Sequence, residues 1–403
     1  MTQPATVAFN PFDPAFRSDP YPVYRRLLED SPVFELPFGG WAFCRYADCV
    51  AILKDARSSS DQRNATAFQE WAREQGIDPD AGARPFLFLD PPDHTRLRGL
   101  VNKAFTPRTV EALRPHIQEI VDDLLDRIAQ QGGMDAIEDL AYPLPVKVIC
   151  EMMGVPLEDH ATFKDWSRHL ARALDPDPLV PPAEIERRQR AIDSFGEYFA
   201  KLIEQRRKAP GDDLLSALIA AEESGDKLSE NELLSTSILL LVAGHETTVN
   251  LIGNGVLALL RHPDQLELLR NDPSLARSAV EEILRFDPPV QFDGRIARED
   301  MEIGGVTIKQ GDQSMQLLGA ANRDPEVFPD PDTFDIRRQD NRHIAFGFGI
   351  HFCVGAPLAR VEGEIALRSL VQRFPRIELR TEAPEYKENI VLRGLRSLPV
   401  SVS

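Results

Sequence analysis

Apolar residues recur at helical spacing over most of the chain. A run that opens at Thr106-Pro107 places apolar side chains three or four positions apart, at Val110, Leu113, Ile117, Ile120, Val121, Leu124 and Leu125. Residues at this spacing share one face of a helix, so the run predicts a helix with one buried face. The same pattern predicts helices over 139–153, 156–174, 184–206 and 212–222.

One further helix is expected to cross the whole molecule. Ser229 and Glu232 have the spacing of a capping box, in which each side chain accepts a hydrogen bond from the other residue's backbone N–H. From this start the helical pattern runs to about Arg261, where Pro263 stops it. At about 1.5 Å per residue the helix would be about 45–50 Å long, so most of it must lie in the core.

Strand patterns are fewer and form short pairs. We expect such pairs over 33–43 with a turn at Gly39-Gly40, over 301–308 with a turn at Gly304-Gly305, and between 376–380 and 398–402. The predicted fold class is therefore mainly α, with small β-sheets at one side of the molecule.

Composition limits the class of protein. The chain has 403 residues, 42% of them hydrophobic, and we find no linker, repeat or low-complexity tract, so a single domain over 1–403 is expected. The net charge of −18 argues against nucleic acid as a partner, because phosphate binding needs a basic surface.

The N-terminal residues, the apolar segments and the cysteines indicate where in the cell the protein is expected. The first residues have neither a basic start nor an apolar run, and the most apolar segment, 238–243, is far shorter than the roughly 20 residues of a membrane span. Four cysteines in so long a chain make no disulfide framework. A soluble cytoplasmic protein without membrane contact is expected.

A single cysteine, Cys353, lies in the stretch FGFGIHFCVG at 346–355. It fits a buried structural cysteine, the commonest fate of a lone Cys. A zinc site would need further ligands, and no CxxC or Cys/His cluster accompanies it. A catalytic nucleophile would need a base such as His351 and a helix N-terminus, and a helix is expected to start near Ala356-Pro357.

A fourth interpretation, a thiolate that ligates haem iron, fits this stretch better. Glycines let a flat macrocycle approach the backbone and let backbone N–H groups point at the sulfur. Phe346 and Phe352 would shield the sulfur from water, and the following helix would direct its positive end toward the thiolate.

At every defining position this stretch resembles the cysteine loop F-G-x-G-x-H-x-C-x-G of the cytochrome P450 family. Other stretches resemble that family's motifs in the right order, namely DPPDH at 90–94, AGHETT at 243–248, EILR at 282–285 and ANRDP at 321–325. The resemblance covers nearly the whole chain. It implies the fold of that family, with a long central helix over haem b and Cys353 as the axial ligand of the iron.

The resemblance also implies roles for the long helix. Ala243 and Gly244 would leave room for the ring and a diatomic ligand, although Gly244, which costs about 1 kcal/mol relative to Ala, also fits a helix–helix contact. Thr247 would hydrogen-bond the bound oxygen and Glu246 would relay protons to it. Adjacent helical residues lie about 100° apart, so the relay needs water or side-chain rotation. His245 is expected on the solvent side or paired with structure.

Four residues match the positions that bind haem propionates in that family: His94, Arg98, Arg295 and His351. Each taken alone also fits a surface charge. Phe346, Gly347 and Gly355 complete the expected contacts to the cofactor.

The family uses Glu282 and Arg285 as a structural ion pair. Many members complete it with an arginine where this chain has Thr333, so the third partner is open. Arg337 and Arg338 are candidates.

Substrate contacts are expected from 58–88, 170–185, 290–292 and 390–392. The last two segments are mostly apolar, which indicates a hydrophobic small organic substrate that Gln291 could orient. Asp61, Arg63 and Asn64 are expected to form a solvated loop.

The implied function is a haem-thiolate monooxygenase that inserts one oxygen atom from O2 into a C–H or C=C bond. No Rossmann fingerprint, flavin domain or iron–sulfur cysteine set is found, so electrons would come from an external ferredoxin- or flavodoxin-type partner with its reductase. Basic residues in 94–114 and 341–374 would form its docking patch. Two alternatives stay open, a peroxide-driven peroxygenase and a non-catalytic haem-binding sensor.

Overall fold

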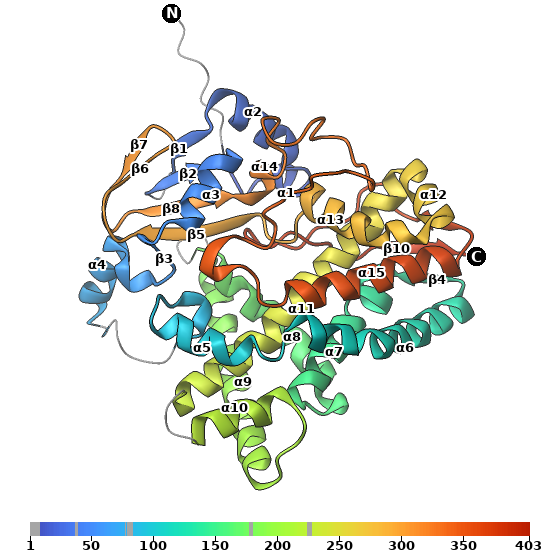
Figure 1. Ribbon diagram of the computed structural model, residues 1–403, viewed down its shortest axis with the longest axis horizontal. Helices are drawn as coiled ribbons and strands as arrows, with labels where there is room; N and C mark the ends of the chain where they lie inside the picture. The colour runs from blue at the N-terminus through green and yellow to red at the C-terminus, as the bar shows by residue number, and fades with distance from the viewer. Residues whose placement is uncertain (1–8, 37–38, 77, 79–83, 177–179, 224–227) are drawn as a thin grey trace, which may run out of the picture.

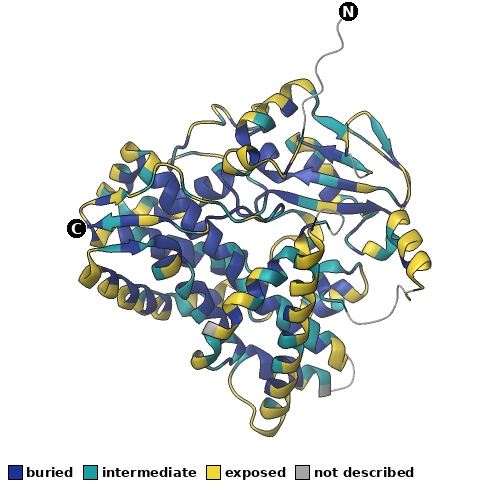
Figure 2. Cartoon of the chain, turned by 180° about the vertical axis from the view of Figure 1, so that it is seen from behind, coloured by how far each residue is buried: buried dark blue, intermediate teal, exposed yellow. Residues whose placement is uncertain are grey.

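The computed structural model describes residues 9–36, 39–76, 78, 84–176, 180–223 and 228–403. A large group of helices occupies one side of the molecule, and the strands β1, β2, β3, β5, β6, β7 and β8 gather at the other (Figure 1). Buried residues concentrate where the central helices meet, and the outer helix faces are exposed (Figure 2). The predicted mainly helical fold with small sheets is confirmed.

Fifteen α-helices are found in the described residues. They are α1 (Pro14–Ser18), α2 (Tyr21–Asp30), α3 (Tyr46–Lys54), α4 (Thr66–Gln75), α5 (Asp93–Val101), α6 (Pro107–Gln131), α7 (Pro143–Met153), α8 (His160–Ala171), α9 (Pro182–Lys208), α10 (Leu214–Glu223), α11 (Glu230–Arg261), α12 (Pro263–Asn271), α13 (Ala276–Phe286), α14 (Leu318–Ala321) and α15 (Ala356–Arg373). Over the described residues, no helix is long and apolar enough to cross a membrane.

The strands form three sheets in the described part of the chain. Their members are β1 (Val33–Glu35), β2 (Trp41–Phe43), β3 (Ser58–Ser59), β4 (Gly133–Asp135), β5 (Phe292–Ala297), β6 (Met301–Ile303), β7 (Val306–Ile308), β8 (Gln313–Leu317), β9 (Ile377–Leu379) and β10 (Pro399–Val402). The first sheet has the order β1-β2-β8-β5-β3, the second β4-β10-β9, and β6 pairs with β7 alone. All pairs are antiparallel except β2 with β8.

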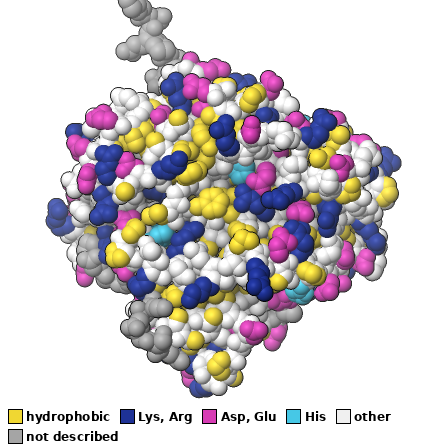
Figure 3. Space-filling model, in the orientation of Figure 1, with side chains coloured by type: hydrophobic (Ala, Val, Ile, Leu, Met, Phe, Trp, Pro, Cys, Tyr) yellow, Lys and Arg dark blue, Asp and Glu magenta, His cyan; other side chains and the backbone are white. Residues whose placement is uncertain are grey.

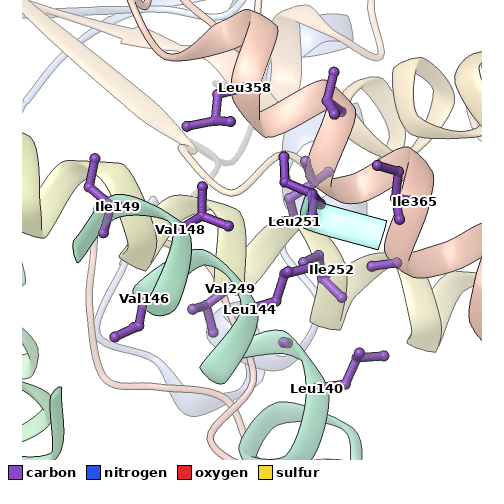
Figure 4. Close-up of a cluster of buried hydrophobic side chains, with 14 of the residues drawn as sticks. Leu140, Leu144, Val146, Val148, Ile149, Val249, Leu251, Ile252, Leu358 and Ile365 are labelled. Atoms are coloured by element: carbon purple, nitrogen blue, oxygen red, sulfur yellow. The ribbon is translucent and has the colours of Figure 1, made fainter. Parts of the chain in front are cut away.

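The long central helix is α11, which begins and ends where the sequence predicts. The capping box is present: the Glu232 N–H donates to Ser229 Oγ over 3.3 Å, and the Ser229 N–H donates to Glu232 Oε2 over 2.7 Å. Most of the second half of α11 is buried, because α7, α8, α9, α13 and α15 pack around it. Figure 4 shows this core, with side chains of α7 and α15 meeting Val249, Leu251 and Ile252 of α11.

The helix expected over 139–153 is in part different. Regular α-helix begins only at Pro143, and residues 136–141 form a wider helical turn whose first N–H groups Asp135 caps. Proline lacks an N–H and fits the first turn of a helix, which explains why a new helix starts there. The three predicted strand pairs are confirmed, whereas β3, β4, β5 and β8 were not predicted.

The buried pair of α13 has its third partner in Arg338. Arg285 donates to both Glu282 oxygens over 2.7 and 2.8 Å, and both side chains are fully buried. Arg338 Nε lies 3.2 Å from each Glu282 oxygen. Thr333 contributes its carbonyl oxygen, which accepts hydrogen bonds from both arginines. Of the two candidates, Arg338 takes the place, and Arg337 lies 60% exposed.

Replacing Arg338 with alanine is expected to lower the free energy of unfolding by about 1.5–3 kcal/mol, because buried Glu282 loses charge-assisted hydrogen bonds. The neighbouring Arg337→Ala is the matched control and should change it by about 0–1 kcal/mol, since exposed ion pairs contribute little. Urea unfolding of both haem-loaded variants, followed by circular dichroism, measures the difference. Equal losses in the two variants would contradict the role of Arg338.

Candidate haem site

The segment 346–355 forms a tight loop that ends at α15. The Cys353 N–H donates to the Phe346 carbonyl oxygen over 2.9 Å, which closes the loop. Gly347 and Gly349 have φ of 70° and 72°, a left-handed conformation that glycine adopts without strain. At Gly349 a Cβ would also lie 2.3 Å from the Leu53 carbonyl oxygen, so no side chain fits there. The helix start near Ala356-Pro357 is confirmed.

Backbone N–H groups at the start of α15 point toward the sulfur of Cys353. Burial raises the pKa of the Cys353 thiol, while the N–H groups of Gly355 and Ala356 and the positive charge of Arg98 act to lower it. Cys353 is nevertheless exposed, in contrast to Cys44, Cys49 and Cys150, which are buried. The sulfur is therefore accessible to a bound group. The arrangement suits a thiolate that acts as a metal ligand.

Four basic side chains meet beside this loop. The rings of His94 on α5 and His351 are 4.1 Å apart, and the buried Arg295 comes from β5. Burial and the neighbouring arginines lower the pKa of His94 to about 4 and that of His351 to about 3. Arg98, on the same face of α5 as His94, donates to the Phe352 carbonyl oxygen. The structure thus brings together the four residues at the positions expected to bind propionates, and that they bind them stays a prediction.

This cluster fits the two propionates of a haem. The Nε2 atoms of His94 and His351 are buried and have no hydrogen-bond partner in the described protein. Among the acids, Asp293 pairs with Arg295 over 2.6 Å, which leaves the cluster with an excess of positive charge. Two carboxylates placed here would accept from the imidazoles and guanidinium groups and remove the electrostatic cost of the cluster.

One face of α11 is less covered than the rest of the helix around it. Ala243 is exposed and Thr247 half-buried, although Val242, His245 and Glu246 around them are buried. Ala243 and Thr247 are four residues apart and therefore share this open face. A Cβ on Gly244 would lie 2.7 Å from the Ile149 side chain of α7, so Gly244 permits a helix–helix contact. The helix–helix contact expected as the alternative for Gly244 is therefore present, and the room for a ring beside Ala243 and Gly244 stays a prediction.

Glu246 is turned away from the open face of α11, toward Lys387 and His245. Its Oε2 lies 3.1 Å from the ammonium nitrogen of Lys387, and its Oε1 lies 3.8 Å from His245 Nε2. Burial would raise the pKa of Glu246, but Lys387 and His245 outweigh it and hold the pKa below its ordinary value. The Thr247 hydroxyl instead donates to the Ala243 carbonyl oxygen over 3.1 Å. The two side chains thus diverge, as their helical spacing predicts.

His245 is not on the solvent side. It is 1% exposed, and its Nδ1 lies 2.7 Å from the Leu241 carbonyl oxygen, one turn back on α11. Its ring lies edge-on to Tyr142 at 6.0 Å. The expectation that His245 is paired with structure is the correct one of the two.

Two expectations are wrong, that Gln291 orients the substrate and that Asp61 is solvated. Gln291 is 3% exposed, and its amide is used by the protein: Oε1 accepts from the Tyr24 hydroxyl and Nε2 donates to the Pro288 carbonyl oxygen. Asp61 is buried rather than solvated and caps the turn at Arg63. The packing of α2 against the first sheet, invisible in the sequence, occupies the Gln291 side chain.

The expected basic patch is largely neutralised. Acids pair with Arg96, Arg114, Arg360 and Arg373. Several of these acids, such as Glu281 and Glu232, lie outside the two basic segments. Figure 3 accordingly shows Lys and Arg interspersed with Asp and Glu over this face. Lys103 and Arg108 stay exposed, and no ion pair is recorded for them among the described residues.

Sequence reasoning missed three residues that surround the site. Lys387 and Asn250 contact Glu246 or its partner, and Asp175 holds the segment that carries Lys387. The buried acid Glu246 was itself a signal, because a carboxylate in a core helix needs a cation. The sequence offers many lysines and arginines and does not say which one folds against it.

Comparison with known proteins gives a consistent result. The sequence model described as "Cytochrome P450" matches residues 64–398. The chain is 46% identical over 410 residues to the polyketide biosynthesis cytochrome P450 PksS of Bacillus subtilis, covering 98% of each chain. It is 43% identical to the vitamin D(3) 25-hydroxylase of Pseudonocardia autotrophica, covering 100% of this chain and 98% of the other.

The fold agrees as well. The ligand-free crystal structure of CYP164A2 from Mycobacterium smegmatis superposes with a TM-score of 0.91 at 46% identity, covering 97% of this chain and 98% of the other. The similarity therefore extends over both the helical side and the sheets.

Proposed function

Because the chain belongs to the cytochrome P450 family, we propose that it holds haem b between the Cys353 loop and α11, and that it oxygenates a hydrophobic small molecule there. Membership makes the protein a haem-thiolate monooxygenase of the bacterial type. One observation supports the assignment of residues. His94 and His351, whose Nε2 atoms have no hydrogen-bond partner among the described residues, lie with two arginines beside the Cys353 loop.

When bound, the haem activates O2 so that one oxygen atom enters the substrate. Cys353 would ligate the iron as a thiolate, held in place by the N–H groups of Gly355 and Ala356. His94, Arg98, Arg295 and His351 would bind the propionates. Phe346 and Gly347 would form the surface on which the ring lies, and Ala243 would leave room on the other face.

Two residues of α11 are proposed to manage protons. The Thr247 hydroxyl lies on the open face of α11 and can turn from the Ala243 carbonyl toward a bound haem. Glu246, one residue earlier, is buried with its carboxylate turned to Lys387. Side-chain rotation or a water molecule must bridge the two, since adjacent helical side chains lie about 100° apart. An intact pair of this kind favours O2 over peroxide as oxidant.

Replacing Thr247 with valine is expected to preserve substrate binding but to lower product formed per NADPH by about tenfold or more, since positioned proton transfer contributes ~10²–10⁴-fold. The lost hydroxyl no longer directs protons, so electrons appear as hydrogen peroxide. Thr248→Val, which removes a hydroxyl from the buried neighbour, is the matched control. Parent-like coupling in Thr247→Val would rule out the proton role of Thr247.

The substrate is proposed to be a hydrophobic organic molecule. Val290 and Val391 are half-buried and come from segments that an isolated bridge between Val290 and Leu392 joins. The relatives named above act in polyketide biosynthesis or on vitamin D(3), which supports a substrate of this kind. A library of polyketides, sterols and fatty acids, screened by the shift of the Soret band on displacement of water from the iron, would test it.

Electrons are proposed to come from a ferredoxin- or flavodoxin-type protein that binds at the Cys353 side. Lys103 and Arg108 are exposed near the end of α5, which contacts the Cys353 loop through Arg98. Together with the exposed Arg342, they would form a smaller basic patch than the sequence predicted.

Lys103→Glu with Arg108→Glu is expected to slow reduction by an acidic ferredoxin about tenfold or more at low salt, because steering by opposite charge is lost. The parent and the variant should converge at high salt, where the screening length falls to about 3 Å. Arg26→Glu with Arg298→Glu, two exposed sites on the sheet side, is the control. Stopped-flow rates of reduction that change neither with salt nor with charge reversal would exclude this patch.

A cytoplasmic location is proposed on the state of the cysteines. Cys44, Cys49 and Cys150 are buried free thiols, which a reducing compartment preserves.

A further inference from the structure

The segment Tyr386–Leu395, here called the C-terminal hairpin, folds back on itself next to α11. Tyr386 and Leu395 form an antiparallel bridge, and the Lys387 N–H donates to the Gly394 carbonyl oxygen over 2.9 Å. A Cβ on Gly394 would lie 1.8 Å from Asn250 Oδ1, so only glycine lets the hairpin approach α11 this closely. The base of the hairpin is therefore fixed one helical turn beyond Glu246.

Lys387 reaches from this base to the buried acid of α11. Its Nζ donates to Glu246 Oε2 over 3.1 Å and to Asn250 Oδ1 over 3.2 Å. The Glu246 side chain is 8% exposed and that of Lys387 is 22% exposed. Lys387 is thus the end of the pair that water reaches, and it draws the carboxylate toward the surface and away from Thr247.

The tip of the hairpin is held by a buried acid from a distant part of the sequence. Asp175, which follows α8 and is 2% exposed, accepts the N–H groups of Ile390 and Val391 on one oxygen, each over 2.9 Å. The other oxygen lies 2.8 Å from Arg172 Nε. Asp175 thus accepts two backbone hydrogen bonds from the hairpin and forms an ion pair with Arg172. The hairpin is therefore fixed at its tip by Asp175 and at its base by α11.

The charge of Lys387 decides the state of Glu246. An ionised carboxylate that loses its cation in a buried place is costly and takes up a proton instead. The other charged or titratable groups that act on Glu246 are His245 on its own helix, Arg168 on α8 and Tyr142 ahead of α7. His245 is 1% exposed, and burial lowers its pKa, so Lys387 is the main positive charge in contact.

We propose that Lys387 is a positioning residue for proton delivery: it keeps Glu246 ionised and turned to the solvent side, and Asp175 sets its position through the hairpin. Glu246 takes each proton from water at the Lys387 end and releases it toward Thr247 after its side chain rotates. This inference rests on the proton role proposed above for Glu246.

The first test measures the charge of Glu246 without turnover. Infrared spectra of the haem-loaded parent minus Glu246→Gln isolate this carboxyl group, over about pH 5 to 8 where folded proteins are most stable. The parent should show only carboxylate, because its pKa lies below the ordinary 4.5. Lys387→Met should show a protonated carboxyl band that grows as the pH falls, Lys387→Arg should not, and Asp175→Ala should show a smaller band. Lys201→Met, at an exposed lysine, is the control.

The second test measures proton delivery. NADPH consumption driven by a ferredoxin and its reductase is compared in H2O and D2O for each variant. Lys387→Met should enlarge the solvent isotope effect and change the pH profile, and Lys387→Arg should restore both. A parent-like Lys387→Met beside an impaired Glu246→Gln would overturn this inference alone. A parent-like Glu246→Gln would overturn the proton role itself, and an unchanged infrared band in Asp175→Ala would remove Asp175 from the proposal.

Discussion

Replacing Cys353 with histidine is expected to abolish the red-shifted Soret band of the reduced, carbon monoxide-bound protein. That band is expected of a haem iron that carries a thiolate ligand, the role proposed for Cys353. Histidine also ligates haem iron, so the variant should keep haem and show the spectrum of a histidine-ligated protein. Absorption spectra after reduction and exposure to carbon monoxide measure the change.

A matched control separates ligation from the general loss of a thiol. Cys150→Ala removes a buried free cysteine from α7 and should retain the band in full. Retention of the band in Cys353→His would show that another residue ligates the iron. Loss of the band in Cys150→Ala would show that the spectrum reports stability instead of ligation.

The sequence predicts the Cys353 loop well because its constraints are local. Gly347 and Gly349 adopt positive φ, Cys353 bonds to Phe346 seven residues earlier, and Ala356 starts a helix. Each of these features depends on residues within the same short stretch. The capping box of α11 is predictable for the same reason, since Ser229 and Glu232 are one helical turn apart.

Features that depend on distant contacts were missed or wrong. Lys387 is 141 residues from Glu246, and Gln291 is 267 residues from the Tyr24 hydroxyl that its amide oxygen accepts from. No periodicity or motif marks such pairs. The strand order of the first sheet was not predicted for the same reason. In that sheet β8 lies between β2 and β5 and pairs in parallel with β2, which is distant in the sequence.

The charge of the surface also could not be predicted from the sequence alone. Counting Lys and Arg in 94–114 and 341–374 predicts a basic patch, yet Arg360 is bound by Glu281 from α13 over 2.6 Å and Arg96 by Glu232 from α11 over 2.5 Å. The counterions come from segments outside the count. The charge of a surface is therefore a property of the fold, and the propionate cluster was found only because each of its members occupies a motif position.

The propionate cluster gives the second large effect expected. The double substitution Arg98→Ala with Arg295→Ala should weaken haem binding by about 10²–10⁴-fold, because each charge-assisted hydrogen bond contributes about 1.5–3 kcal/mol. His94 and His351 remain and still offer one ring nitrogen each to the propionates, and burial disfavours the charged form of both imidazoles. Two imidazoles replace only part of the attraction of the two guanidinium groups, each of which has several N–H donors and a permanent charge.

Haem transfer from the variant to an excess of haem-free globin measures this loss as a rate. Arg26→Ala with Arg298→Ala, which removes two exposed guanidinium groups from the sheet side, should transfer haem as slowly as the parent. Arg98 has a second role that must be separated from haem binding, because it also donates to the Phe352 carbonyl oxygen and so stabilises the loop. Arg295→Ala alone does not touch that contact and should still accelerate transfer. Parent-like retention in both Arg295→Ala and the double variant would place the propionates elsewhere.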